Sequence, residues 1–533
     1  MRLARSTFAL LFLAPLATAC GDDGGSTDSG ETSQTGDGDG DPTGDGDGDG
    51  DGDGDPTGDG DGDPTGDGDG DPTGDGDGDG DPQGDPCTPT DWNPADFATV
   101  YDVGPGHAYE DPSAVPWDAL GPGSLIRIHW REQPYRDKWV INSAGTEAAP
   151  IVVTGVPDNG QLPVISGDGA KTRSELSFWN QQRGLIKIGG ADAPGGDVAS
   201  WIYIENLDLR DANSTNSFTS TNGADQGYAD NAAALYVEWG DNLYFRNNEV
   251  SWSGNGIFTG SQSSDVHVQC NYVHDNGVAG SIYQHNSYTE SVRITFEFNH
   301  YGPLCPGCGG NNLKDRSAGT VIRYNWLEAG NRQLDLVESD HDELIALPEY
   351  ATTYVYGNVL VEPDGAGNGQ ILHYGGDLGD QDYYRKGTLH LYNNTVISTR
   401  NGNTTWMRLS SNGETCDARN NVVYVTAGGA TLAMTDGAGQ LELRNNWVVE
   451  GWRDTHGTLT GSVEDLGGNV YGTDPGFLDF DGQEFGPAPA SELRDAGGPL
   501  ANGVNAPSWA YVVHQSGAPR TDDGELDIGA FEG

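Results

Sequence analysis

The chain is poor in basic residues. Of its 533 residues only 26 are Lys or Arg, against 82 Asp and Glu, so the formal net charge is −56. This balance disfavours a nucleic-acid-binding protein, because neutralising phosphates needs a basic surface. A total of 82 Gly and 28 Pro with only five Lys also argues against an all-helical or coiled-coil chain. No segment approaches the ~18 consecutive apolar residues of a membrane-spanning helix.

The acidic excess is unevenly distributed. Residues 21–86 contain 24 acidic residues, 24 Gly and no Lys or Arg. With no apolar residues to bury, 20–86 is expected to be a disordered, acidic Gly–Asp linker. The pattern Asp-x-Asp-x-Asp-Gly recurs there, but a calcium loop also needs a distal Glu and flanking helices, so a spacer is favoured. Residues 87–533, with a net charge of −34, can form one elongated repeat domain or two compact ones.

The N-terminus has the features of an export signal. Two arginines precede the apolar run Phe8–Ala17, and small residues follow it, so 1–19 is predicted to be a signal peptide. The junction Ala17-Thr18-Ala19-Cys20 resembles a bacterial lipobox, which implies acylation of Cys20 and a membrane anchor. Gly21 at the next position indicates the outer membrane by the usual sorting pattern. Ordinary cleavage after Ala19, leaving a free thiol, is the alternative.

A short motif recurs from about Trp201, in which an alternating strand of β-branched or aromatic residues ends in Asn. The terminal Asn residues lie 23 to 36 positions apart, which indicates a constant core section with insertions confined to loops. Asn tolerates left-handed turn geometry, and side chains stacked every ~4.8 Å can bond each other. These residues are therefore expected to be structural. They are Asn248, Asn271, Asn299, Asn325, Asn358, Asn394, Asn421 and Asn446.

This pattern resembles that of right-handed parallel β-helix proteins of the pectin-lyase-like group, over about Thr99–Gly533. Residues 103–107 and 150–156 resemble the opening strands of that group, and 474–477 and 527–532 resemble its closing segment. The resemblance implies an all-β, single-domain right-handed parallel β-helix over 87–533. The fold hosts lyases, hydrolases, epimerases, esterases and adhesins, so it does not by itself identify a reaction.

A second strand follows each terminal Asn, and alternation places its leading aliphatic residues inward and their neighbours outward. In the β-helix polysaccharide enzymes that the chain resembles, this face is the substrate cleft. Residues 285–335 carry five basic and five acidic residues, so this segment has no net charge although the whole domain carries −34. An acidic sugar would therefore be repelled less here than elsewhere on the domain. Taken singly, each side chain could merely bond a neighbouring coil. The expected outward set is Tyr283, His285, Lys314, Arg316, Asp335, His373 and Arg408.

The segment Asn311–Asn325 is similar to the Lys-Ser…Tyr-Asn segment of alginate lyases and chondroitinase-B-like lyases. The resemblance implies that Lys314 takes the C5 proton of a uronate, with an Arg of the following coil as acid and calcium at the C6 carboxylate. A buried Lys flanked by cations loses proton affinity and becomes a usable base. The following coil has no matching Arg, so Arg316 or His285 is the expected substitute. The other expected roles are catalysis for Tyr283 and substrate binding for His373, Arg408 and Arg332.

The acidic residues after Lys314 allow two further hypotheses. Asp335 and Glu338 could bind Ca²⁺, although a solvated acidic loop is the common alternative. Two carboxylates near one another could also make a glycoside hydrolase. A non-catalytic carbohydrate-binding or adhesion β-helix is the third class. The leading hypothesis is a monomeric, surface-tethered lyase that cleaves an acidic polysaccharide by β-elimination.

Five cysteines remain after Cys20. In an exported chain, Cys305-Pro-Gly-Cys308 predicts a short disulfide in a loop before Lys314. Cys270 is expected to pack as a small apolar core residue. The pairing of Cys87, Cys270 and Cys416 stays open.

Overall fold

A computed structural model of the protein describes residues 84–192, 198–521 and 524–533. The signal peptide 1–19, the acylation of Cys20 and the linker up to residue 83 lie outside the described residues and stay predictions. Within the described ranges, no helix is both long and apolar enough to cross a membrane. Asp85 accepts a hydrogen bond from Ser516 Oγ (2.9 Å), so the last residues assigned to the linker already contact the domain.

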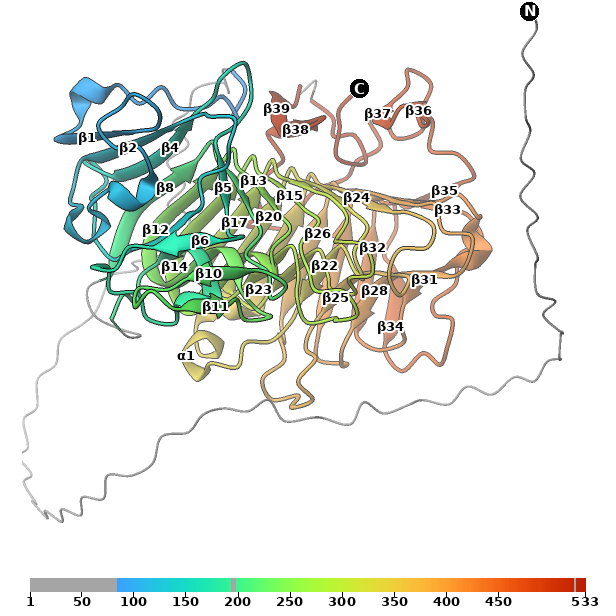
Figure 1. Ribbon diagram of the computed structural model, residues 1–533. Coiled ribbons are helices and arrows are strands. Elements are labelled where there is room, and N and C mark those ends of the chain that lie inside the picture. Colours follow the sequence, from blue (N-terminus) through green and yellow to red (C-terminus); the bar gives the residue numbers. More distant parts are fainter. Residues whose placement is uncertain (1–83, 193–197, 522–523) are drawn as a thin grey trace, which may run out of the picture. The chain divides into compact units, whose positions relative to one another are not determined.

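The described chain winds into a right-handed parallel β-helix, as the sequence predicts (Figure 1). Successive turns pair in parallel and form three columns of strands, here named the first, second and third sheets. In a complete turn the chain passes from the first sheet to the second and then to the third, as in β19, β20 and β21. The long strands β12 and β14 run through both the first and the second sheets.

Most strands belong to one of these sheets. The first sheet contains β3 (Asp137–Ile141), β7 (Gly184–Ile188), β12 (Ala233–Arg246), β14 (Asn255–Gln269), β16 (Ser287–Thr289), β19 (Leu313–Asp315), β22 (Leu334–Leu336), β25 (Gln370–Tyr374), β28 (Thr404–Leu409) and β31 (Leu432–Thr435). The second sheet contains, besides β12 and β14, β1 (Thr99–Val103), β2 (Ser124–His129), β4 (Ile151–Val156), β8 (Ala199–Glu205), β17 (Val292–Glu297), β20 (Ala318–Arg323), β23 (Thr352–Tyr356), β26 (Thr388–Tyr392), β29 (Thr415–Arg419), β32 (Gln440–Arg444) and β34 (Ser462–Asp465). The third sheet contains β5 (Val164–Ser166), β9 (Asp208–Arg210), β13 (Glu249–Ser251), β15 (Tyr272–His274), β18 (His300–Tyr301), β21 (Trp326–Glu328), β24 (Val359–Glu362), β27 (Thr395–Ser398), β30 (Val422–Val425), β33 (Trp447–Val449) and β35 (Val470–Gly472).

The remaining elements are short. One side sheet and two hairpins lie outside the three columns, and a single α-helical turn follows β22. They are β6 (Ala170–Thr172), β10 (Ser217–Thr219), β11 (Asp225–Gly227), β36 (Phe477–Asp479), β37 (Glu484–Pro487), β38 (Trp509–Val512), β39 (Ser516–Pro519) and α1 (Asp342–Ile345).

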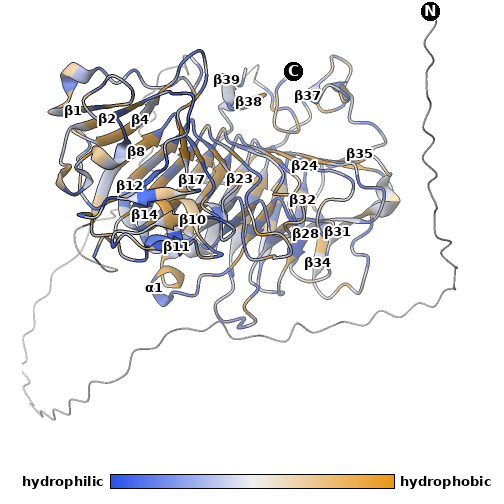
Figure 2. Cartoon of the chain, viewed as in Figure 1, coloured by the Kyte–Doolittle hydropathy of each residue, from blue (hydrophilic) through white to orange (hydrophobic). Residues whose placement is uncertain are grey.

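The core is a continuous apolar column inside the coil. Alternate residues of each strand point inward, and aliphatic residues such as Leu313, Leu334 and Leu372 are fully buried there. Figure 2 shows hydrophobic residues concentrated in the stacked strands and hydrophilic residues in the loops. The interior is therefore closed by packing, and polar residues that act on a ligand must lie on the outward faces.

The predicted Asn ladder is confirmed. From Asn248 to Asn446, the Nδ2 of each terminal Asn donates to the Oδ1 of the next at 2.9–3.1 Å, and the series continues to Asn469. The same Oδ1 also accepts from a backbone N–H, as when Asn299 N donates to Asn325 Oδ1 (2.9 Å). Each ladder Asn thus satisfies buried backbone groups of its neighbours.

The residue before each ladder Asn, and not the ladder Asn itself, adopts the left-handed backbone conformation. Asn247, Asn393 and Asn420 have φ of 50–54°, which explains the repeated Asn-Asn pairs. Cys270 takes the same position with φ 59° and pairs with Cys87 in a disulfide, fully buried in an apolar cluster with Phe298 and Tyr324. The expectation that Cys270 packs as a small apolar core residue is confirmed, and its pairing with Cys87, which the sequence leaves open, comes from the structure. The predicted Cys305–Cys308 disulfide is present, and Cys416 is a buried free thiol.

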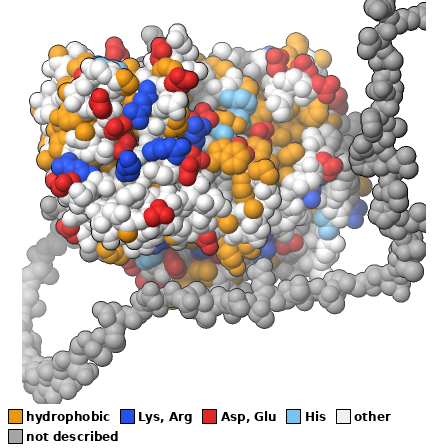
Figure 3. All heavy atoms as spheres, viewed as in Figure 1, with side chains coloured by type: hydrophobic (Ala, Val, Ile, Leu, Met, Phe, Trp, Pro, Cys, Tyr) orange, Lys and Arg blue, Asp and Glu red, His pale blue; other side chains and the backbone are white. Residues whose placement is uncertain are grey.

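The surface does not carry its negative charge uniformly. On the face shown in Figure 3, Lys and Arg side chains gather over the N-terminal part of the coil near β5, and hydrophobic side chains gather over its middle. A negative total charge therefore does not prevent a local site from attracting an anion.

Replacement of one ladder residue, Asn325→Ala, should lower the free energy of unfolding by about 3 kcal/mol. The change removes the acceptor of Asn299 N and the donor to Phe296 O, and both groups are buried. Urea denaturation followed by circular dichroism measures the effect. The control Asn502→Ala, at an exposed turn, should change stability by less than about 0.5 kcal/mol. Equal losses in both variants would contradict a structural role of the ladder.

Candidate functional site

The register of the first sheet places polar side chains from successive turns in one outward column. Lys314 pairs with Asp335, Asp335 with His373, and His373 with Arg408, so these four predicted residues are neighbours. Parallel strands lie ~4.8 Å apart, which brings long side chains on adjacent turns into contact. The column also contains Phe258 and Tyr288.

Tyr283 is not part of this column. It lies in the loop before β16 with 73% of its surface exposed, whereas Tyr288 occupies the outward position next to Lys314. The predicted strand was placed several residues too early, because a loop of variable length precedes β16. Tyr288 and Thr289, an aromatic and a β-branched residue that both favour strands, were the signal that could have located β16 (Ser287–Thr289).

Lys314 is held between two carboxylates. Its Nζ donates to Asp335 Oδ2 (2.8 Å) and to Asp377 Oδ2 (2.5 Å), and the residue is only 7% exposed. Burial acts to lower the pKa of Lys314, but the two carboxylates outweigh burial and the neighbouring Arg316, so the pKa is raised. The expected loss of proton affinity is therefore wrong, because carboxylates rather than cations dominate its surroundings.

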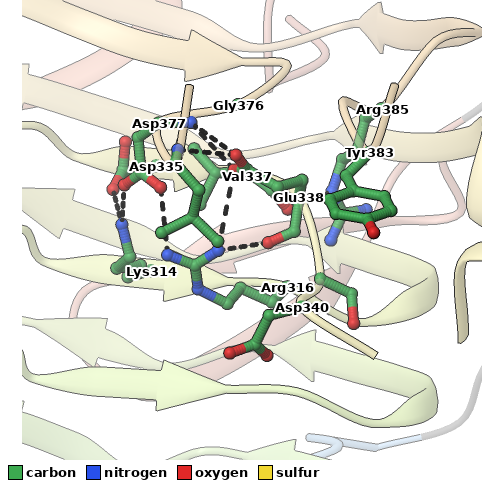
Figure 4. Close-up of polar contacts among 12 residues, drawn as sticks. Lys314, Arg316, Asp335, Val337, Glu338, Asp340, Gly376, Asp377, Tyr383 and Arg385 are labelled. Carbon is green, nitrogen blue, oxygen red and sulfur yellow. Dashed lines mark hydrogen bonds and ion pairs between the residues drawn. The ribbon is translucent and has the colours of Figure 1, made fainter. Parts of the chain in front are cut away.

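Arg316 binds the same carboxylate as Lys314. Its Nη2 donates to Asp377 Oδ1 (3.0 Å), its Nε donates to Tyr288 Oη (3.1 Å), and its Nη1 donates to the backbone oxygen of Glu338. Figure 4 shows Lys314 and Arg316 pointing toward Asp377 from neighbouring positions of β19 and its end. Asp377 comes from the loop after β25 and was not identified from the sequence, because nothing in that loop marks it as part of the site.

Asp335 and His373 form a second set of contacts. Asp335 Oδ1 accepts from His373 Nδ1 (2.7 Å), and His373 Nε2 lies 2.7 Å from Ser410 Oγ. Burial acts to raise the pKa of Asp335, but Lys314 and His373 hold it well below its usual range. Burial lowers the pKa of His373 despite the nearby carboxylate, so the imidazole is neutral at neutral pH. Ser410 was not predicted, although strand alternation after Arg408 places it outward.

His285 lies beside the column rather than in it. Its Nδ1 accepts from the backbone N–H of Asn311 (2.8 Å), and its ring contacts the edge of Tyr288. Burial and, next, the charge of Lys314 lower its pKa to about 3. With Nδ1 occupied, the neutral ring carries its proton on Nε2 and can donate a hydrogen bond but not take a proton.

The two remaining predicted residues flank the far end of the column. Arg332 donates through Nε and Nη2 to Gln370 Oε1 (3.1 and 2.6 Å), and its Nη1 lies 3.8 Å from Asp335 Oδ1. Arg408 is the more open of the two, with 39% of its side chain exposed, and it pairs with Asp436 at 3.9 Å. Both guanidinium groups add positive charge near His373.

Asp335 and Glu338 do not fit a calcium site. The oxygens of Asp335 already accept from Lys314, His373 and Asn311, and those of Glu338 accept from the backbone N–H groups of Asp377 and Leu378. A cation there would have to displace Lys314 and Arg316. Among the described residues, a different group near the site brings ligand atoms within 4.8 Å of one another, namely Glu290, Asp340 and His341.

The comparisons with solved structures bear only on how the chain is folded. A pectate lyase, Pel9A, aligns with 82% of this chain and 96% of its own at 14% identity and a TM-score of 0.45. An alginate lyase from Paenibacillus sp. str. FPU-7 aligns with 65% of this chain and 98% of its own at 11% identity and a TM-score of 0.41. The alginate lyase AlyGC of family PL6 aligns at 12% identity and a TM-score of 0.29, covering 77% and 60% of the two chains. No protein-family model and no curated protein sequence matches this chain.

Neutralisation of the central carboxylate, Asp335→Asn, should lower the free energy of unfolding by about 3 kcal/mol at pH 7, because Lys314 loses a buried partner. The pKa of Asp335 is depressed in the folded state, so its contribution is complete above pH ~4 and is lost on further acidification. The difference between wild type and variant should therefore shrink below that pH. Urea unfolding over a pH series measures it.

The control for this experiment is Asp436→Asn, which removes an exposed carboxylate from the same column. Its pairing with Arg408 is solvent-screened, so stability should change by less than about 0.5 kcal/mol. A gap between wild type and Asp335→Asn that widens on acidification would contradict the ionised state assigned to Asp335.

Proposed function

We propose that the protein cleaves a uronate-containing polysaccharide by β-elimination at the outward column of the first sheet. The observation that carries the proposal is the pair of cations around Asp377. Lys314 Nζ and Arg316 Nη2 both bind this one carboxylate, whose side chain is 34% exposed while those of the two cations are 8% and 6% exposed. Such a pair is a preformed receptor for a carboxylate that arrives from the solvent side.

A substrate carboxylate can take the place of Asp377 without a backbone movement. Glu338 accepts the backbone N–H groups of Asp377 and Leu378 at 2.6–3.0 Å, so the backbone of this loop is held from behind. Rotation of the Asp377 side chain alone would free both cations. Once they neutralise the C6 carboxylate of a uronate, the C5 proton becomes acidic, because the developing charge spreads onto that carboxylate.

The protonation state of Lys314 indicates a different role for this residue from the proton-abstracting role expected from the sequence. Lys314 has a raised pKa and stays protonated, so it binds the carboxylate rather than taking the proton. Tyr288, whose Oη accepts from Arg316 Nε, is the neighbouring group placed to exchange protons. Removal of the C5 proton forms the C4–C5 double bond, the C4–O bond breaks, and the leaving oxygen receives a proton.

The paired carboxylates do not favour a glycoside hydrolase. Asp335 and Asp377 both have lowered pKa values, because cations outweigh their burial. Neither keeps a proton at neutral pH for the leaving oxygen, which a glycosidase requires of one carboxyl group. The assay described below also separates this proposal from the third hypothesis, because an adhesion protein would show no turnover.

Tyr288→Phe should reduce kcat by at least about 100-fold and change KM little, since only proton transfer is lost. The measurement is the ultraviolet absorbance of unsaturated uronate released from polygalacturonate, alginate and glycosaminoglycans. Tyr283→Phe is the matched control and should behave as wild type, because Tyr283 lies outside the column. If wild type produces no absorbance from any of these polymers, the elimination reaction is excluded for them.

Asp377→Asn should lower KM several-fold and leave kcat nearly unchanged. The neutral side chain competes less well with the substrate carboxylate for Lys314 and Arg316. Asp380→Asn, an exposed residue on the same loop, is the control and should have no effect. Initial rates over a range of polymer concentrations give both constants. A raised KM would show that Asp377 contributes to substrate binding instead.

A further inference from the structure

Three side chains beyond the cation pair are joined end to end. Asp335 Oδ1 lies 2.7 Å from His373 Nδ1, and His373 Nε2 lies 2.7 Å from Ser410 Oγ. Asp335 and His373 are each 1% exposed, whereas Ser410 is partly exposed. A hydroxyl at the open end of a buried imidazole–carboxylate pair is the arrangement of an activated nucleophile.

The backbone of the coil makes this arrangement possible. The backbone N–H of Ser410 donates to Tyr374 O (3.1 Å), so Ser410 continues the pairing of β28 with β25 and points outward, beside Gly375. A Cβ on Gly375 would lie 2.7 Å from Ser410 Oγ, and Gly375 has φ of 132°. Only glycine leaves room there for the hydroxyl to reach the imidazole.

The positions of the protons follow from the partners. Asp335 is ionised and accepts, so His373 carries its proton on Nδ1 and its Nε2 is an acceptor. The Ser410 hydroxyl therefore donates to His373 Nε2. The backbone N–H of Gly376 donates to the same Oγ (2.9 Å), and Gly376 O lies 2.9 Å away as a second acceptor for the hydroxyl proton. His373 Nε2 is the nearer of the two acceptors, at 2.7 Å.

We propose that Ser410 is the nucleophile of a second activity, the hydrolysis of a small carboxylic ester carried by a sugar, with His373 as general base and Asp335 as its orienting partner. That the ester is borne by an acidic sugar polymer rests on the proposed function; the hydrolysis does not. Lys314, which binds Asp335 on the side opposite His373, acts as a positioning residue.

The reaction is balanced with water as the only co-reactant. Ser410 Oγ bonds to the acyl carbon as its proton moves to His373 Nε2, and the bond to the alcohol oxygen breaks as that oxygen takes the proton. Water then attacks the acyl-serine, gives a proton to His373 Nε2, and the proton returns to Ser410 Oγ as the acid leaves. The products are one carboxylic acid and one alcohol.

The surroundings of Ser410 select the substrate. The backbone of Gly375 and Gly376 borders the hydroxyl closely, which leaves room for a small acyl group such as acetyl. Arg408 lies on the same outward face two residues earlier, with its side chain 39% exposed, and it would attract an acidic polymer.

The decisive experiment treats the whole protein with a fluorophosphonate probe and para-nitrophenyl acetate. Wild type should be labelled at Ser410, as located by peptide mass spectrometry, and should hydrolyse the ester. Ser410→Ala and His373→Gln should each lose label and at least ~1000-fold of kcat/KM. Ser411→Ala, the adjacent serine whose hydroxyl bonds Glu414, should retain both. Thermal unfolding followed by circular dichroism checks that each variant is folded.

Analysis of the released product shows which kind of ester the site hydrolyses. Release of acetate from acetylated polyuronate supports the proposal in full, whereas release of methanol from methyl-esterified polyuronate supports the triad and overturns the assignment of a small acyl group. Tyr288→Phe should leave ester hydrolysis intact, and Ser410→Ala should leave elimination intact, so the two activities fail independently. The proposal is overturned if wild type is neither labelled at Ser410 nor faster than Ser410→Ala on any of these esters. The Ser410 hydroxyl would then serve only to hydrogen-bond the backbone of Gly376.

Discussion

In-register hydrogen bonding between successive turns is the constraint on which both proposed activities depend. It repeats every strand position at ~4.8 Å, so residues far apart in sequence become neighbours along a column. A slip of one residue would exchange the inward and outward sets, turning Lys314 into the apolar interior and Leu313 outward. The Asn ladder opposes such a slip, because each ladder side chain donates to the Asn at the equivalent position of the next turn.

The same column sets the protonation of its members. Lys314 keeps Asp335 ionised, Asp335 orients the neutral His373, and His373 Nε2 lies 2.7 Å from Ser410 Oγ. Buried charges of this kind are tolerated only when each has a partner, and loss of one leaves the next uncompensated. The protonation of Lys314, Asp335 and His373 is therefore set by their contacts with one another and not by any one residue alone.

One loop contributes to both ends of the site. The segment after β25 supplies Asp377 to the cation pair and Gly376 to Ser410. Its base is held closed, since Arg385 N donates to Gly375 O (3.0 Å) while the guanidinium of Arg385, fully buried, bonds Val337 O and Asp315. The proposed exchange of Asp377 for a substrate carboxylate therefore requires only a side-chain rotation on this loop, and not a large opening of its backbone.

The sequence by itself indicated the parallel β-helix, through the resemblance of its repeated motif to the pectin-lyase-like group. It also determined the Asn ladder and the outward positions of Lys314, Asp335, His373 and Arg408, because these follow from strand alternation and a motif repeated once per turn. It misplaced Tyr283 and overlooked Tyr288, since alternation gives no register when a loop of unknown length comes first. Only the tertiary structure brought Asp377 to Lys314 and Ser410 to His373. Those contacts depend on the path of one loop and on the missing side chain of Gly375, and neither leaves a periodic signal in the sequence.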